Sequence, residues 1–290
     1  MSTSRILITG ANGQLGKELR KISLASPDSE YFFLSKDEMP IQAAQKVDEI
    51  FEKIRPTHCI NCAAYTAVDK AESEKEKAFL INSEAVGILA SACKSSKTKL
   101  FHISTDYVFD GNSSNPLKED DTTNPINVYG QSKLSGELLA LKNNEDTVII
   151  RTAWLYSSFG NNFVKTMIRL MKERDAINVV SDQIGSPTYA GDLANAILKI
   201  IISGKFIPGV YNYSNEGQIS WFEFASSIRE LIGSSCIVKP IPASQYPTPA
   251  KRPHYSLLDK TKIKNTYGLE IADWKSSLVK CIDQIKKEEV

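Results

Sequence analysis

The chain lacks any apolar run that approaches the ~20 residues of a membrane-spanning helix, so we expect no transmembrane segment. It also lacks an excess of charge of one sign, because 35 Lys and Arg residues are matched by 34 Asp and Glu residues. A balanced charge gives no general attraction for nucleic acid or an anionic membrane. The N-terminus shows no signal-peptide pattern, since the apolar run around Ile6 leads straight into glycines.

Cysteines are few, odd in number and scattered: Cys59, Cys62, Cys93, Cys236 and Cys281. Cys59 and Cys62 form a C-x-x-C, but inside a strand-like run, whereas a redox pair is expected near a helix start. We therefore predict that these thiols pack in the core. The pattern indicates a reduced, soluble, cytoplasmic protein.

At 290 residues the chain fits one nucleotide-binding domain plus a smaller lobe. Strand-like runs alternate with helical patterns at residues 5–9, 31–34, 58–62, 100–104 and 147–151, with helices expected at 77–94 and 128–141. This alternation predicts an α/β fold with a Rossmann-type, doubly wound parallel sheet. We place the nucleotide-binding domain at residues 1–152, with returning segments around 189–215. A C-terminal substrate-binding lobe then takes up most of residues 153–290.

A glycine-rich turn directly follows the first strand-like run. Gly10, Gly13 and Gly16 have the spacing G-x-x-G-x-x-G, a variant of the dinucleotide fingerprint, and a helical pattern follows. Such glycines let the backbone approach a pyrophosphate, whose charge is favoured at a helix N-terminus. Glycines also serve simple chain reversal, but the flanking strand and helix favour cofactor binding.

The end of the second strand-like run bears on the choice of cofactor. Ser35 and Lys36 stand where an acidic residue would hydrogen-bond the ribose of NAD. Without that carboxylate, the position can accommodate the 2′-phosphate of NADP. Asp37 and Glu38 follow closely, so we favour NADPH and keep NADH as possible.

Tyr129 and Lys133 lie four residues apart in a helical pattern, so they project from one face. A phenol normally loses its proton near pH ~10, and a neighbouring ammonium lowers that pKa. Such a pair is also common as an exposed packing couple. Together with the glycine turn, it indicates a proton donor and its partner.

Ligands of parallel sheets bind beyond the carboxyl ends of the strands, which directs attention to residues 10–16, 63–70, 105–111 and 152–156. The polar, aperiodic segment 110–125 is a loop and a candidate lid beside that edge.

On these motifs the chain resembles the extended short-chain dehydrogenase/reductase superfamily. Within it the chain resembles the dTDP-4-dehydrorhamnose reductase family over nearly its whole length. The glycine turn and the Tyr/Lys pair mark the superfamily. The run from Asn61 to Asp69, Trp154 and the run from Asp182 to Thr188 are more particular to the reductases. Further matching segments are residues 104–109, 151–154 and 252–253.

The resemblance implies NAD(P)H-dependent reduction of the 4-keto group of a dTDP-linked sugar, in the dTDP-rhamnose pathway for cell-wall polysaccharide. Tyr129 would be the general acid. Lys133 would hold the nicotinamide ribose and lower the Tyr129 pKa, and Thr105 would hydrogen-bond the ketone. The expected cofactor-binding residues are Gly10, Asn12, Gly13, Gln14, Leu15, Gly16, Ser35, Lys36, Ala63, Ala64, Tyr65, Tyr129 and Lys133.

The same resemblance implies a nucleotide-sugar site. Its expected residues are Thr66, Val68, Asp106, Trp154, Asn162, Phe163, Gln183 and Arg252, with Asn82, Asn161 and Asp182 nearby. Trp154 would pack against the sugar, its alternative being a core aromatic. The Arg252 guanidinium matches a diphosphate bidentately.

Several positions depart from the family pattern. Met39-Pro40-Ile41 replaces a Leu-Asp-Ile, and His254-Tyr255 follows Arg252-Pro253 in place of Ala-Asn. Some relatives form a dimer through a carboxylate-bound magnesium ion. Glu18 and Asp192 lie near the expected places, but acids on exposed helices are usually solvated, so we predict no metal. The chain is expected to be a monomer or a homodimer.

Other functions remain open. A related deoxy-ketosugar nucleotide could be the substrate, since sequence does not reveal the sugar's stereochemistry. A dehydratase is disfavoured, because Thr105-Asp106-Tyr107 lacks the Asp-Glu pair of those enzymes. A non-catalytic NADP-binding subunit, like the regulatory subunit of methionine adenosyltransferase, is a further alternative. The intact set of Thr105, Tyr129 and Lys133 favours catalysis.

Overall fold

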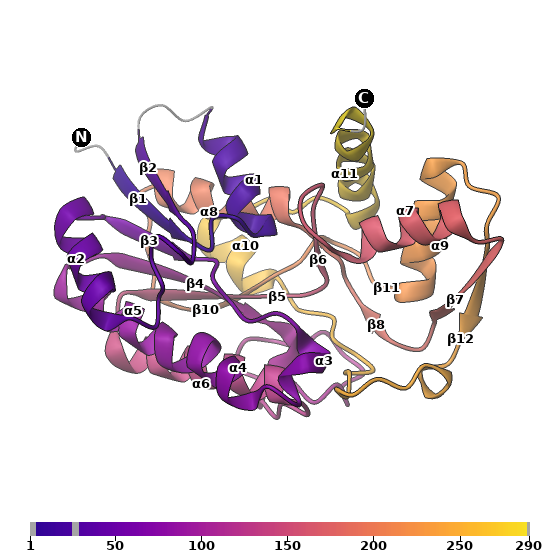
Figure 1. Ribbon diagram of the computed structural model, residues 1–290, viewed down its shortest axis with the longest axis horizontal. Coiled ribbons are helices and arrows are strands. Elements are labelled where there is room, and N and C mark those ends of the chain that lie inside the picture. Colours follow the sequence, from indigo (N-terminus) through magenta and orange to yellow (C-terminus); the bar gives the residue numbers. More distant parts are fainter. Residues whose placement is uncertain (1–3, 25–28, 289–290) are drawn as a thin grey trace.

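A six-stranded parallel sheet forms the centre of the larger half of the molecule (Figure 1). The computed structural model describes residues 4–24 and 29–288. The strand order is β10-β5-β4-β3-β1-β2. The strands are β1 (Ser4–Thr9), β2 (Ser29–Leu34), β3 (His58–Asn61), β4 (Lys99–Thr105), β5 (Thr147–Thr152) and β10 (Gly209–Tyr213). The predicted α/β class with a Rossmann-type parallel sheet is confirmed.

The first strand shows why its sequence is almost continuously apolar. Ile6, Leu7 and Ile8 are all fully buried. Because side chains alternate across a sheet, Ile6 and Ile8 enter the core on one face and Leu7 enters the core on the other. A parallel strand covered on both faces has no solvent side that would need polar residues.

Helices cover both faces of this sheet. One face packs against α1 (Gln14–Ser23), α8 (Ala190–Ile202) and α10 (Thr261–Tyr267). The other packs against α2 (Ala44–Ile54), α5 (Ala85–Ser95) and α6 (Val128–Asn143). The sheet is therefore doubly wound.

The chain reverses its direction of travel across the sheet at β1. From β1 it passes to β2 on one side, and then returns to β3 on the other side. Ligands of open α/β sheets bind at such a switch point, beyond the carboxyl ends of the strands. The glycine turn after β1 lies there.

The helix predicted at 77–94 is interrupted by a π-turn. It consists of α4 (Lys75–Phe79), the π-helical η1 (Leu80–Glu84) and α5, and it follows the short α3 (Val68–Ala71). Asn82 sits in the π-turn, accepts the Tyr65 backbone N–H at 2.8 Å and donates to the Tyr65 carbonyl at 3.0 Å. The wide turn therefore lets a buried amide hold the segment that follows β3, a role of π-turns that periodicity does not reveal.

A second hydrophobic core lies beside the sheet, at the right of Figure 1. The parallel pair β7 (Ala176–Val180) and β12 (Ile237–Ile241) packs here with α7 (Phe163–Glu173), α9 (Trp221–Ile232) and α11 (Trp274–Glu288). The remaining short elements are β6 (Leu155–Tyr156), β8 (Ile184–Gly185), β9 (Thr188–Tyr189), β11 (Ile219–Ser220), η2 (Asp106–Val108) and η3 (Ala243–Gln245). Within the described ranges, the helices are too short or too polar to cross a bilayer.

The loop at 110–125 is anchored at its middle. Leu117 N–H donates to the Leu257 carbonyl at 2.8 Å, and Asp259 N–H donates to the Leu117 carbonyl at 2.8 Å. Arg151 binds the Glu119 carbonyl at 3.2 Å. These contacts tie the centre of the loop to the framework, and its role as a lid stays a prediction.

Candidate active site

The turn after β1 is built for close approach of another backbone. Gly10 has φ +63°, and a Cβ there would lie 2.7 Å from the Ala63 backbone nitrogen. A Cβ on Gly16 would lie 2.6 Å from the Gly10 carbonyl oxygen. Helix α1 starts after Gly13, which has no side chain to cap its first N–H groups. This geometry fits a dinucleotide whose pyrophosphate accepts those N–H groups.

The other residues expected to bind the cofactor at this turn differ in how far their side chains are exposed to solvent. Leu15 is buried in the sheet core, so only its backbone can face a phosphate, whereas Asn12 is exposed. Ala63, Ala64 and Tyr65 form the facing turn after β3, which the Asn82 amide fixes.

A carboxylate occupies the turn after β2. The Ser35 N–H donates to Glu38 Oε2 at 2.8 Å, and this bond holds the pKa of Glu38 below its usual range. Lys36 is exposed, and Arg20 lies 4.4 Å from the Phe33 ring centre and acts electrostatically on Glu38. Arg20 was not predicted from the sequence, because it comes from α1 and is brought to the end of β2 only by the fold.

Tyr129 lies at the start of α6, against the carboxyl end of β4. Burial raises its pKa to about 12, while a hydrogen bond with Thr105 opposes the rise. Its ring meets Tyr107 edge-on at 5.6 Å. The expectation that Lys133 lowers the Tyr129 pKa is wrong for this structure, because burial dominates and Thr105 provides the opposing contact.

Lys133 is almost fully buried one turn further along α6. Its Nζ donates to the Ile103 carbonyl at 2.6 Å and lies 3.5 Å from His102 Nε2. Burial lowers its pKa to about 8, and Glu137 opposes that change. An ammonium has three N–H donors, so others remain for the hydroxyls of a ribose.

A buried ion pair holds α6 in place. Arg151 on β5 binds Glu137 through Nη2 at 2.7 Å and Nε at 3.0 Å, and Ser104 on β4 donates to Glu137 at 2.5 Å. Glycine makes the contact of α6 with η2 possible, since a Cβ on Gly130 would lie 2.2 Å from the Tyr107 carbonyl oxygen. These contacts fix the height of Tyr129 and Lys133 above the sheet.

A cleft of about 1290 Å³ lies beside the second core, and Asp110, Asn112 and Ile126 from the segment between β4 and α6 also line it. Among its described lining residues are Phe163, Gln183 and Arg252 of the expected substrate set. Four of the lining residues are Lys or Arg (Arg174, Lys239, Lys251 and Arg252), against one acid, Asp110. This balance suits a diphosphate.

Trp221 is a cleft residue that the sequence analysis missed. It lines the cleft and stacks on Trp154, with ring centres 3.6 Å apart and planes 13° apart. Trp154 has φ +48°, an unusual conformation for a bulky residue. Trp221 is the first residue of α9, whose N-terminus is capped by Ser220 and Glu223 in a capping box. This sequence signal predicts where the helix begins, but it does not reveal that the Trp221 ring stacks on Trp154.

Arg252 already has an anionic partner. Its Nη2 binds Asp69 Oδ2 at 2.7 Å and its Nη1 binds Asp69 Oδ1 at 3.1 Å, which holds the pKa of Asp69 below its usual range. The bidentate geometry expected toward a diphosphate is thus directed at Asp69 in this structure. Thr66 and Val68 lie in the same segment, before and at the start of α3.

Asn162 uses its side chain for structure. Its Oδ1 caps α7 by accepting the Lys165 N–H at 3.1 Å, and its Nδ2 donates to Gln14 Oε1 at 3.0 Å and to the Ser157 carbonyl at 2.7 Å. It therefore links α1 to the second core.

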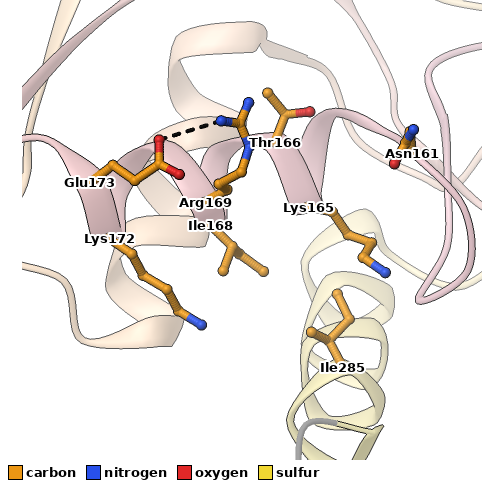
Figure 2. A pocket seen from close by; sticks show the side chains of 8 residues that line it. All are labelled: Asn161, Lys165, Thr166, Ile168, Arg169, Lys172, Glu173 and Ile285. Atoms are coloured by element: carbon orange, nitrogen blue, oxygen red, sulfur yellow. Dashed lines mark hydrogen bonds and ion pairs between the residues drawn. The ribbon is translucent and has the colours of Figure 1, made fainter.

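A second cavity, of about 380 Å³, lies between α7 and α11. Figure 2 shows Lys165, Arg169 and Lys172 projecting from α7, with the ion pair from Arg169 to Glu173 and with Ile285 on α11. Of the residues singled out from the sequence, Asn161 lines this cavity. It is separate from the Tyr129 cluster.

The expectation of solvated acids at Glu18 and Asp192 is wrong for Glu18. Glu18 is buried, accepts the Ser157 hydroxyl at 2.6 Å, and has a raised pKa because of its burial. Asp192 accepts Asn215 Nδ2 at 2.8 Å and the Ser277 hydroxyl. In the described part of the chain, no cluster of three His, Cys, Asp or Glu side chains is arranged to hold a metal ion.

Comparisons with known proteins identify the family of the chain. The family model described as RmlD substrate binding domain matches residues 4–287. A protein named dTDP-4-dehydrorhamnose reductase from Aggregatibacter actinomycetemcomitans is 42% identical over 95% of this chain and 97% of its own length.

Two solved structures are similar throughout. A dTDP-4-dehydrorhamnose reductase from Clostridium acetobutylicum has a TM-score of 0.93 and 42% identity, covering 97% of this chain and 99% of its own. One from Bacillus anthracis, in complex with NADP, has a TM-score of 0.94 and 40% identity, covering 98% of this chain and all of its own.

Proposed function

The chain belongs to the RmlD substrate binding domain family, with dTDP-4-dehydrorhamnose reductases among its close relatives, and from this premise we propose its reaction. It reduces the 4-keto group of dTDP-4-dehydro-L-rhamnose to give dTDP-L-rhamnose, in dTDP-rhamnose biosynthesis, with NADPH as the cofactor. The observation that carries the proposal is the position of Tyr129 with Thr105 at the carboxyl end of β4. There the pair flanks the edge that holds the glycine cradle.

The chain's own groups then have the following roles. The reduced nicotinamide, when bound, supplies the hydride. Tyr129 donates its proton to the ketone oxygen, and its high pKa keeps it protonated until negative charge develops there. Lys133 binds the nicotinamide ribose with the N–H groups that Ile103 leaves over. Gly10, Gly13 and Gly16 admit the pyrophosphate.

The cleft binds the nucleotide diphosphate. Arg252 acts as a cation held in place by Asp69, and Phe163 and Trp221 provide aromatic surfaces for the base or sugar. Arg20 offsets the Glu38 carboxylate at the end of β2, and Lys36 follows the strand, so these two cations support NADPH over NADH. We assign residues 1–152 with 189–215 to cofactor binding, and residues 153–290 mainly to the substrate lobe. The protein acts in the cytoplasm as a monomer or homodimer.

A different dTDP-deoxy-ketosugar would use the same chemistry. A non-catalytic NADP-binding subunit would have no need of the Thr105 contact with Tyr129, so the geometry favours an enzyme. The deciding experiment mixes the purified protein with NADPH and dTDP-4-dehydro-L-rhamnose and follows nicotinamide absorbance. The same assay is repeated with NADH and with a stereoisomeric ketosugar.

Oxidation of NADPH that is fastest with dTDP-4-dehydro-L-rhamnose and yields dTDP-L-rhamnose supports the proposal. Binding of NADPH without turnover of either ketosugar contradicts it and favours the regulatory subunit.

A further inference from the structure

We propose that Asn61 and His102 are positioning residues for the cofactor. Asn61 holds the His102 ring with its hydrogen on Nε2, so that Lys133 keeps two of its N–H groups for the hydroxyls of the nicotinamide ribose. The inference rests on the proposed function, because it explains how Lys133 is made ready to bind that ribose.

The side chains of this network are neighbours on three adjacent strands of the sheet. Thr9 on β1 lies in register with Asn61 on β3, and Asn61 lies in register with His102 on β4. The three residues are 1%, 1% and 0% exposed, so bulk water does not compete for their hydrogen bonds. Buried polar groups must find partners within the protein, and the position of each hydrogen is therefore constrained.

The backbone N–H of Ala63 determines which way the Asn61 amide faces. This N–H donates to Asn61 Oδ1 at 3.2 Å, and the Thr9 hydroxyl donates to the same oxygen at 2.6 Å. An amide nitrogen in that place would set its own hydrogens against the Ala63 N–H. The amide is therefore assigned with its oxygen toward Thr9 and Ala63 and its nitrogen toward His102.

The amide nitrogen in turn determines the tautomer of His102. Asn61 Nδ2 lies 3.1 Å from His102 Nδ1. Because Nδ2 only donates, Nδ1 accepts and carries no hydrogen, and a neutral imidazole then carries its hydrogen on Nε2. A doubly protonated ring would face Asn61 with a second donor. Burial, together with the charge of Lys133, also lowers the pKa of His102 well below its usual range.

The hydrogen on Nε2 decides which groups Lys133 can bind. Lys133 Nζ donates to the Ile103 carbonyl at 2.6 Å and lies 3.5 Å from His102 Nε2, which is long for a hydrogen bond. A protonated Nε2 offers no lone pair, so the ring takes no hydrogen from the ammonium. Two of the three ammonium hydrogens therefore remain for the ribose. In the other tautomer Nε2 would accept one of them.

The same network reaches the pyrophosphate turn. Thr9 directly precedes Gly10, and a Cβ on Gly10 would lie 2.7 Å from the Ala63 backbone nitrogen. The backbone that orients the Asn61 amide is thus the backbone that packs against the glycine turn. One set of hydrogen bonds positions both the turn for the pyrophosphate and the ammonium for the ribose.

The tautomer can be read directly by nitrogen NMR of the wild-type protein labelled with ¹⁵N-histidine and free of cofactor. The chain has three His residues, and the spectra of His58→Gln and His254→Gln assign the signals of the other two. Near neutral pH we expect His102 to show a protonated Nε2 and an unprotonated Nδ1. A hydrogen on Nδ1, alone or in addition to one on Nε2, would overturn the proposal.

Asn61→Asp should reverse the tautomer. The carboxylate is nearly isosteric and still accepts from Thr9 and Ala63, but its second oxygen requires a hydrogen on Nδ1 of the ring. Nε2 then presents a lone pair that captures one N–H of Lys133, and we expect the Kd for NADPH to rise about tenfold. Asn195→Asp, an exposed position on α8, makes the same change of charge and should keep the wild-type Kd. An unchanged Kd in Asn61→Asp would contradict the proposal.

A double-mutant cycle separates this role from a general disturbance of the sheet. In a Lys133→Met background the ring has no ammonium to capture, so adding Asn61→Asp should change the Kd for NADPH by less than about twofold. An equal loss of affinity in both backgrounds would overturn the proposal. If Asn61→Asp does not fold, the wild-type tautomer still decides.

The outcome for the reaction is distinguishable from the outcome for the network. The expected tautomer and a normal double-mutant cycle, without turnover of either ketosugar, would mean that the proposed reaction is wrong and the positioning role stands. Turnover of dTDP-4-dehydro-L-rhamnose by a protein whose His102 carries its hydrogen on Nδ1 would mean the opposite.

Discussion

In the cofactor cradle the fit comes from backbone, whereas in the substrate cleft it comes from side chains. Gly10 and Gly16 leave no room for a Cβ, and the first N–H groups of α1 are presented by main chain. The cleft instead presents Trp221 and Phe163 together with several cations. A binding site formed by closely packed backbone should be disrupted by substitutions that add a side chain. A binding site formed by side chains should be disrupted by substitutions that remove them.

Tyr129 is the proposed general acid, so its loss should slow the reaction strongly and leave cofactor binding nearly unchanged. Tyr129→Phe removes the proton donor, and we expect kcat to fall by about 10³-fold, or ~4 kcal/mol of transition-state stabilisation. Binding of NADPH, followed by nicotinamide fluorescence, should change little. Tyr267→Phe, on α10 away from the site, is the control and should keep its kcat. Wild-type turnover by Tyr129→Phe would remove the general-acid assignment.

Gly10→Ala should break the cradle alone. The new Cβ would lie 2.7 Å from the Ala63 nitrogen and impose a strained positive φ, so we expect a loss of ~2–4 kcal/mol in unfolding free energy or cofactor binding. Gly268→Ala is the matched control. It also has a positive φ, of +65°, but its Cβ meets open space among the described atoms, so ~1 kcal/mol is expected. Calorimetric titration with NADPH and thermal unfolding measure both. Equal losses in the two variants would mean that close approach at Gly10 is unimportant.

Trp221→Ala should break the cleft alone. Losing the ring that stacks on Trp154 should raise KM for the nucleotide sugar about tenfold, or ~1.4 kcal/mol, with an unchanged Kd for NADPH. Trp274→Ala is the control, because Trp274 packs on Phe224 in the same core and is not among the cleft-lining residues. It should lower Tm without raising KM. A similar KM increase in both variants would indicate general loosening of the lobe.

Arg20→Ala gives the smallest expected effect and refines the cradle's specificity. Because an exposed charge contributes little, we expect the Kd for NADPH to rise by about fivefold, or ~1 kcal/mol, with the Kd for NADH unchanged. Lys53→Ala on α2 serves as a charge-matched control. An equal rise of the Kd values for NADPH and NADH in Arg20→Ala would contradict this role of Arg20.

The same contrast explains what could be read from the sequence. The buried strands can be recognised in the sequence as apolar runs. The glycine turn and the Tyr129/Lys133 pair are each formed by residues close together in the sequence. These local signals sufficed to predict the parallel sheet, because each strand needs only its own residues to be recognised.

Contacts between distant segments left no such signal. Arg252 pairs with Asp69, 183 residues away, and Glu18 accepts a hydrogen bond from Ser157, 139 residues away. The burial of Tyr129 outweighs any help from its neighbour Lys133, so its pKa rises where the sequence predicted a fall. Electrostatics of this kind depends on desolvation, which is a property of the folded whole.

The most direct measurement of the central claim is the fate of the hydride. The protein would be given NADPH that carries deuterium at both positions of carbon 4 of the nicotinamide, together with dTDP-4-dehydro-L-rhamnose, and the sugar product would be examined by NMR. We expect dTDP-L-rhamnose that carries deuterium at its carbon 4, formed about 10³-fold more slowly by Tyr129→Phe. A sugar product without deuterium, or with deuterium at another carbon, would contradict the proposed reaction.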